Sequence, residues 1–208
     1  MSSMVNTLRF KALLSAAFGA LIFAAPSAAQ TAPDKTGDAM VARQPGEMDA
    51  AISKWELLQK NSQLGFFDYA GFAMAHPEFP RMDIIRERAE KTLAVEAPSR
   101  TDLLRYFDAL GPLTNPARAR YAVALAGAGR VEAREVAREA WRSGTMEEAV
   151  ELTLESLYWR QFTPADHAAR MDALLWQGNT GAATRHMVKL SPADKKLAMA
   201  RLALVSGA

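Results

Sequence analysis

Apolar residues recur at helical spacing along the chain from Met48 onward. Such stripes mark one face of an amphipathic helix. No segment shows the sustained alternation of apolar and polar residues that a half-buried strand requires. The pattern therefore predicts an all-α fold. The clearest stripes are Ala133, Val136, Ala137, Ala140 and Trp141; Val150, Leu154, Leu157 and Tyr158; and Met171, Leu174 and Leu175.

Several expected helix starts carry a capping pattern, in which a serine or threonine is followed three residues later by an acidic residue. The hydroxyl accepts a hydrogen bond from a free N–H of the first turn. Pro164 and Pro192 fit the first helical position, where the missing N–H costs nothing. Asn115 before Pro116 predicts a start of the same type. The capping pairs are Ser99 with Asp102, Thr145 with Glu148, Thr163 with Asp166, and Ser191 with Asp194.

Glycines follow the expected helix ends, where a left-handed backbone conformation is favoured. Short helices joined by such tight turns predict antiparallel hairpins of sequential neighbours. The glycines are Gly111, Gly129, Gly144 and Gly178.

Two stretches about fifty residues apart resemble each other. "ARYAVALAGAGRVEAR" begins at Ala119 and "ARMDALLWQGNTGAAT" begins at Ala169, and each joins an apolar helix to an Ala-rich second helix through a glycine break. Helix pairs that recur in this way are typical of solenoids. We therefore expect a right-handed α-superhelix of stacked helical hairpins, similar to tetratricopeptide repeats. An ordinary closed helical bundle is the alternative.

Residues 1–29 have the three parts of a secretory signal peptide. Arg9 and Lys11 form the positive region, residues 12–25 form the apolar region, and a small-residue cleavage site ends at Ala29. We expect export with cleavage after Ala29 and no stable membrane insertion afterwards. The alternative is an uncleaved anchor helix, but the apolar run is shorter than the roughly 20 residues that span a bilayer.

The remaining chain divides into a flexible leader over residues 30–47, rich in Pro, Gly and Thr, and a helical domain over residues 48–208. The whole chain holds 25 basic and 23 acidic residues, and residues 1–29 hold two basic residues and no acid, so 23 of each remain. A neutral domain lacks the basic surface that nucleic acid requires. The chain has no cysteine, so no disulfide staples it.

Candidate chemistry is sparse. His76, His167 and His186 have no partner at metal-ligand spacing, and the last two are expected to be partly buried packing residues. Phosphate-binding, dinucleotide-binding and nucleophile motifs are missing from the sequence. The aromatic residues fall mostly at helical spacing, which favours core packing over a carbohydrate-stacking platform. We therefore predict no catalytic, cofactor-binding or metal-binding residue.

Glu155 is the strongest candidate for an enzymatic residue. Glu155-Ser156 matches the start of the motif that carries the acid/base glutamate of lytic transglycosylases, but the Gly-Leu-Met-Gln-like turn of that motif is missing downstream. Glu148, Glu151 and Glu155 form a stripe spaced three and four residues apart, which is typical of a solvated helix face. We expect Glu155 to be inactive.

Three stretches resemble the superhelical, U-shaped N-terminal region of soluble lytic murein transglycosylases of Gram-negative bacteria. They read "TPADHAARMDALLWQGN", "GAATRHMVKLSPADKKLAMARLAL" and "RARYAVALAGAGRVEAREVAREAW", and the resemblance covers residues 50–205. In that family the catalytic module is a separate lysozyme-like domain near the C-terminus, and we expect residues 1–208 to stop before any such module. The resemblance implies that Thr163 and Asp166 cap a helix. It also implies that Met171, Leu174, Leu175 and Trp176 pack, and that Arg170 and Asp172 form surface or inter-helix polar contacts.

The resemblance implies a periplasmic, non-catalytic scaffold that takes part in peptidoglycan turnover, with glycan strands as its partner. The alternative is a free-standing periplasmic helical-repeat adaptor that binds another protein. Residues 192–208 are apolar on nearly every side, which predicts a helical domain that is incomplete at its C-terminus and self-associates through this helix.

Overall fold

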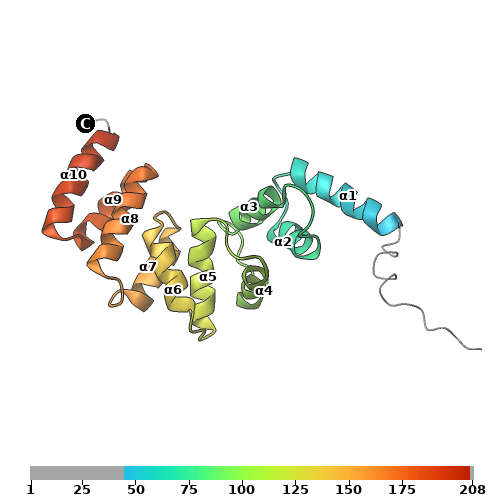
Figure 1. The fold of residues 1–208 in the computed structure, drawn as a ribbon, viewed down its shortest axis with the longest axis horizontal. Helices are drawn as coiled ribbons and strands as arrows, with labels where there is room; N and C mark the ends of the chain where they lie inside the picture. Colours follow the sequence, from blue (N-terminus) through green and yellow to red (C-terminus); the bar gives the residue numbers. More distant parts are fainter. Residues whose placement is uncertain (1–44, 207–208) are drawn as a thin grey trace, which may run out of the picture. The chain divides into compact units, whose positions relative to one another are not determined.

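The computed structural model describes residues 45–206, in which every regular element is a helix (Figure 1). The predicted all-α class is confirmed for this part of the chain. Residues 1–29 and nearly all of the expected leader lie outside the described residues. No described helix is long and apolar enough to cross a membrane. The helices are α1 (Pro45–Lys60), α2 (Phe66–Ala75), α3 (Met82–Thr92), α4 (Arg100–Leu110), α5 (Asn115–Gly127), α6 (Ala133–Arg142), α7 (Glu148–Tyr158), α8 (Pro164–Trp176), α9 (Thr180–His186), the 3-10 helix η2 (Met187–Lys189) and α10 (Pro192–Ser206).

Buried apolar residues form three clusters that follow one another along the chain. The first joins α1 to α4 and is built mainly from aromatic and large aliphatic side chains. The second joins α5, α6 and α7 and is rich in alanine. The third joins α8, α9 and α10. Their largest members are Phe66, Tyr69, Ile85, Tyr106 and Phe107 in the first, Leu154 and Met146 in the second, and Met171, Leu174 and Leu175 in the third.

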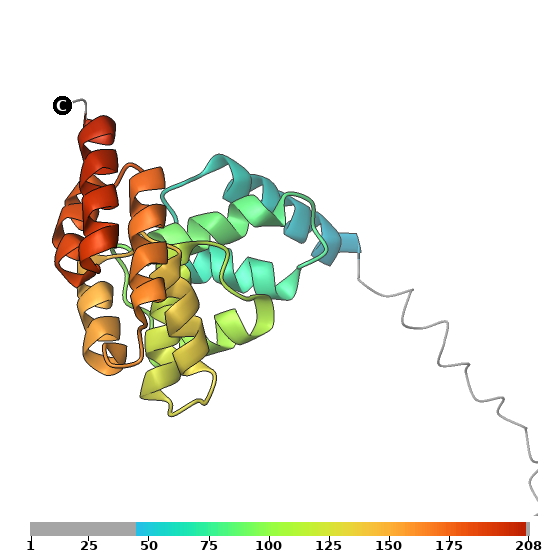
Figure 2. The ribbon, with the colours of Figure 1, turned by 60° about the vertical axis from the view of Figure 1, so that its left-hand side comes forward.

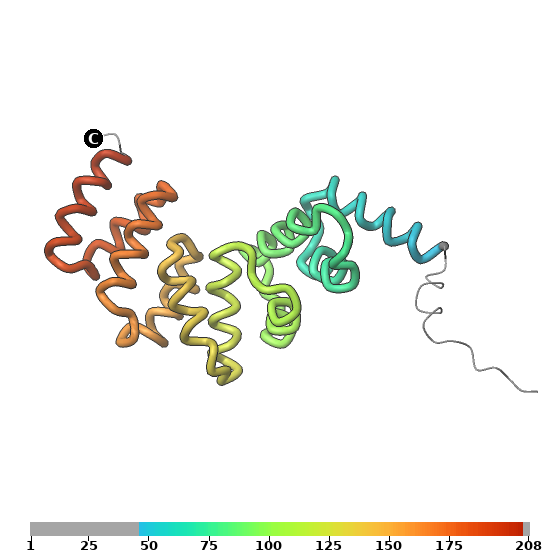
Figure 3. The backbone as a smooth tube through the Cα atoms, viewed as in Figure 1, coloured from blue at the N-terminus to red at the C-terminus, as the bar shows by residue number. Residues whose placement is uncertain are grey.

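Helix α5 joins the two ends of the helical region. It is the only described helix that contacts both the α1–α4 group and the α6–α10 group. Ala117 on one side of α5 belongs to the first cluster, whereas Ala119 and Ala122 belong to the second. The small side chains allow the backbones of neighbouring helices to approach closely. The tube trace shows the helices following one another in chain order with α5 in the middle, and the turned ribbon shows the same succession from another side (Figures 2 and 3).

Three of the predicted caps are confirmed. The side chains of Ser99, Thr163 and Ser191 each accept a hydrogen bond from the backbone N–H three residues later. At Thr163 the capping box is complete, because Asp166 also accepts from the backbone N–H of Thr163. The predicted start at Met48 lies three residues inside α1, which begins at Pro45.

Two predicted caps are wrong. Glu147, not Thr145, is the N-cap residue of α7, and Thr145 instead donates its N–H and hydroxyl to Oε1 of Gln177. Thr114, not Asn115, caps α5. The Asn115 amide is used elsewhere, because it donates to the carbonyls of Ala140 and Thr145. The side chains of Thr145 and Asn115 therefore bond to groups outside their own helices and do not cap α7 and α5.

The four predicted glycine turns are confirmed, since each glycine has a positive φ. Gly144 also needs its small size, because a Cβ there would lie 2.6 Å from Oε1 of Gln177. This close approach lets the Gln177 side chain form hydrogen bonds with the backbone of the segment that joins α6 to α7.

Candidate functional site

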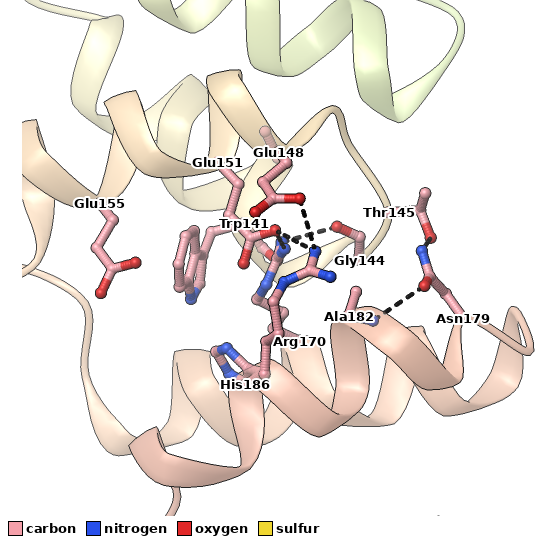
Figure 4. A network of polar contacts seen from close by, with 12 residues as sticks. Trp141, Gly144, Thr145, Glu148, Glu151, Glu155, Arg170, Asn179, Ala182 and His186 are labelled. Atoms are coloured by element: carbon pink, nitrogen blue, oxygen red, sulfur yellow. Dashed lines mark hydrogen bonds and ion pairs between the residues drawn. The ribbon is translucent and has the colours of Figure 1, made fainter.

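Glu151 of α7 faces Arg170 of α8 (Figure 4). Basic side chains of α9 and η2 also lie against the acidic side chains of α7. Glu151 pairs with Arg170 and lies 3.8 Å from Arg185, and Glu155 accepts from Nζ of Lys189. The glutamate stripe was expected to form a solvated face. That expectation is wrong for Glu151, which is buried, because the stripe lies against the next helical hairpin.

Arg170 is the centre of this charged cluster. Its side chain is 0% exposed. Nη2 lies 3.0 Å from Oε2 of Glu151, and Nη1 donates to the carbonyl of Gly144 at 2.7 Å and to that of Trp141 at 3.3 Å. A cation is favourable at the C-terminal end of α6, where backbone carbonyls lack helical partners. Burial lowers the pKa of the guanidinium, and the Glu151 carboxylate opposes that change. Arg170 therefore ties α6, α7 and α8 together.

Trp141 forms the apolar wall of the charged cluster. Its ring stacks on Phe162 with a centroid distance of 4.5 Å, and the Arg170 guanidinium lies 4.4 Å from its centroid. A cation over an indole face is attracted by the ring quadrupole, and the attraction strengthens when water is excluded. Lys189 approaches the same ring at 5.5 Å. The predicted packing role of Trp141 is confirmed.

His167 and His186 lie side by side at the edge of this cluster, with ring centroids 5.3 Å apart. Nε2 of His186 lies 3.1 Å from the carbonyl of His167, so a neutral ring donates its proton there. Burial lowers the pKa of His186 to about 3, and Arg170 adds to the effect. Burial also lowers the pKa of His167, with a further contribution from Lys189. The predicted burial of His186 is confirmed.

A second polar cluster surrounds Asp166. Its carboxylate is 0% exposed and accepts from Arg138 and Arg142 of α6, each at 2.9 Å, and from Thr163. Burial opposes ionisation of Asp166. The hydrogen bonds from Thr163, Arg138 and Arg142 outweigh burial and hold the pKa of the carboxyl well below its usual range. The N-cap of α8 thereby also fastens α8 to α6.

The contacts of the polar clusters join neighbouring helices. Glycoside hydrolysis by an acid/base pair needs carboxyl groups that reach the substrate. Glu155 instead binds Lys189, and Glu151 is enclosed between arginines. Within residues 46–205 no three His, Asp or Glu side chains gather to hold a metal ion.

Several individual expectations from the sequence need correction. Trp176 was expected to pack, but its side chain is 86% exposed at the end of α8. Phe67 and Trp159 are also exposed, so core packing explains only some of the aromatic residues. Arg170 was expected to make a surface or inter-helix contact, and it is an inter-helix residue that is fully buried. Asp172 pairs with Arg201 of α10 as an inter-helix contact.

A groove of about 370 Å³ lies between α4, α5 and α7, away from both polar clusters. The stripe pattern of single helices did not predict it, because the groove arises from the spacing of three helices. Arg100 and Arg120 lie at its margin. Its apolar lining comprises Leu103, Val123, Ala124, Ala126, Val150 and Leu157.

Comparison of the chain with protein-family models, with characterised proteins and with solved structures finds no match. Function is therefore proposed from the residues and their geometry.

Proposed function

We propose that this chain is a periplasmic, non-catalytic superhelical scaffold of the lytic transglycosylase type, which binds peptidoglycan glycan strands during cell-wall turnover. One observation carries the proposal. In the described region the backbones of α1–α10 approach one another only between helices at most two places apart in the chain order. A side-chain contact reaches one place further, where Trp141 of α6 meets His186 of α9. Contacts restricted to near neighbours are typical of a solenoid, whereas a closed bundle brings distant helices together.

The side chains around Glu155 support a guiding role rather than a cleaving one. The Glu155 carboxylate binds Lys189, which also lies over the Trp141 ring. A carboxylate held by a partner within the protein is poorly placed to reach the glycosidic oxygen of a substrate.

Two measurements on the purified mature chain test the proposal. Co-sedimentation with isolated peptidoglycan sacculi should deplete the chain from the supernatant, and chromatography of the digest should reveal no anhydro-muropeptides. Turnover that disappears in Glu155→Gln would contradict the non-catalytic role. Sacculi that leave the chain in the supernatant at low salt would contradict the glycan-binding role.

The second candidate is a free-standing periplasmic adaptor that binds a protein. The groove between α4, α5 and α7 favours it, because apolar residues line a depression at the surface. Failure to bind sacculi together with peptide binding in this groove would select the adaptor.

A further inference from the structure

We propose that the groove between α4, α5 and α7 binds an amphipathic, acidic segment of a partner protein. The proposal does not depend on peptidoglycan binding, since it rests on the shape and charge of the groove alone.

The groove has a small-residue floor and aliphatic walls. Ala124 and Ala126 of α5 line it together with Gly127, while Leu103 lies on α4 and Leu157 lies on α7. Helices α4 and α7 each contact α5 but do not contact each other. Small residues of α5 therefore lie at the base of a depression with an aliphatic wall on each side, as in grooves that accept one face of an amphipathic segment.

The margin of the groove is positively charged. The Arg100 guanidinium lies across Gly127, where a Cβ would come within 2.7 Å of Nε, and Nη1 donates to the Gly127 carbonyl. Among the described residues no ion pair joins Arg100 to a carboxylate. Arg120 pairs with Glu147 at 3.3 Å, which leaves Arg100 as the uncompensated charge. Acidic groups beside the apolar residues of a ligand complement this arrangement.

A peptide fits these features better than a single-chain amphiphile does. Aliphatic residues approach from α4 and from α7, so a ligand with two or more apolar side chains contacts both walls at once. The groove volume of about 370 Å³ lies within the range of small-ligand sites, and it opens at the surface rather than closing around a buried chain.

Fluorescence anisotropy tests the proposal. The probe is a fluorescein-labelled helical peptide that repeats Glu-Ala-Leu-Leu, and the mature chain is added to it in increasing concentration. A matched peptide carries lysine in place of each glutamate. We expect saturable binding of the acidic peptide only. Leu157→Glu should weaken it about tenfold, since an apolar contact is lost and an acid faces an acid. Arg100→Gln keeps a donor for the Gly127 carbonyl and should weaken binding about threefold while reducing its salt dependence.

Two control variants separate the groove from general surface effects. Leu152→Glu alters an exposed leucine on a different side of α7, and Arg105→Gln removes an exposed charge from α4 outside the groove. Both should bind the acidic peptide as the unmodified chain does. Circular dichroism confirms that each variant folds.

The proposal is overturned by equal binding of the lysine peptide, by the absence of saturable binding, or by equal losses in the control variants. Displacement of the peptide by dodecanoate, with tighter binding of dodecanoate itself, would assign the groove to a small amphiphile instead.

Discussion

The α1–α4 region and the α6–α9 region differ in the kind of side chain that fills the centre of each. In the first, Phe66, Tyr106 and Phe107 pack edge to face in an apolar cluster. In the second, the largest buried contacts combine Trp141 with the charged side chain of Arg170. Apolar packing is non-directional and tolerates changes of shape, whereas a buried charge needs its particular partner. The two regions should therefore respond differently to equally conservative substitutions and to acid.

The largest expected effect follows from removing the charge of Arg170. Arg170→Met keeps a long side chain but leaves the buried Glu151 carboxylate with only Arg185, 3.8 Å away. We expect the free energy of unfolding to fall by about 3 to 5 kcal/mol, because breaking a buried ion pair leaves one charge uncompensated. Urea unfolding monitored by circular dichroism measures this change.

The double variant Arg170→Met with Glu151→Met should recover much of that loss, since it buries no unpaired charge. Phe66→Leu provides the matched change in the aromatic cluster and should cost about 1 kcal/mol. If Arg170→Met costs no more than Phe66→Leu, the proposed difference between the two regions does not exist.

The next effect compares two acidic residues in the first turns of helices. Asp166→Asn removes the charge that binds Arg138 and Arg142 and weakens the capping box of α8. We expect a loss of about 2 kcal/mol in the free energy of unfolding. Asp102→Asn in α4 is the control, because Asp102 pairs with the exposed Arg105 and should contribute below about 1 kcal/mol. Equal losses in thermal or urea unfolding would contradict this distinction.

Acid should loosen the α6–α9 region first. His186 has its pKa lowered to about 3 in the fold, so the folded state binds fewer protons than the unfolded state at pH values above 3 and below the unfolded pKa of about 6.5. The stability from the neutral ring is fully present above that unfolded pKa and declines as the pH falls towards 3. Between pH 6.5 and pH 5 the loss is at most about 2 kcal/mol.

Hydrogen exchange at pH 7 and pH 5 locates this loss. After correction for the slower intrinsic exchange of amides at pH 5, protection should fall in peptides from α6 to α9, and the fall should be smaller in His186→Gln, whose amide can donate to the His167 carbonyl. A uniform fall in protection that extends over α1–α4 would show that the acid response is not local to the histidine pair.

The sequence predicted the features that depend on local spacing. The caps at Ser99, Thr163 and Ser191 and the glycine turns need only a few neighbouring residues. The caps at Thr145 and Asn115 failed because other helices compete for those side chains. Local patterns thus determine where helices begin and end more reliably than they determine which polar groups meet.

The sequence does contain an indication of the buried pair between Arg170 and Glu151, although an amphipathic pattern alone does not identify the two partners. Arg170 lies between His167 and Leu174 on the buried side of α8, and Glu151 precedes Leu154 on the buried side of α7. One charged residue of each sign within two apolar stripes predicts a buried pair, but choosing the partner requires knowing which helices adjoin. The groove between α4, α5 and α7 likewise depends on three helices that no local pattern brings together.

The smallest expected effect on stability comes from substitutions on the exposed side of α10. The self-association through this helix that the sequence predicts stays a prediction. Leu197 and Leu204 are 62% and 79% exposed, and Ala200 between them is also exposed. The three residues are spaced three and four apart, so they share one outer side of the helix. Leu202, in contrast, packs against the buried cluster of α8 and α9. A substitution at Leu202 would therefore test folding as well as association.

The variant Leu197→Glu with Leu204→Lys alters only the outer side of α10 and keeps the net charge. We expect the unmodified mature chain to gain apparent mass with concentration in light scattering, because contact between copies removes these leucines from water. The variant should remain a monomer with the same helix content, and its free energy of unfolding should change by less than about 0.5 kcal/mol, as is usual for surface substitutions. Val131→Glu is the control, since Val131 is even more exposed but lies in the turn between α5 and α6. This variant should associate as the unmodified chain does. If the unmodified chain stays monomeric at the highest protein concentration measured, the exposed leucines of α10 do not drive association.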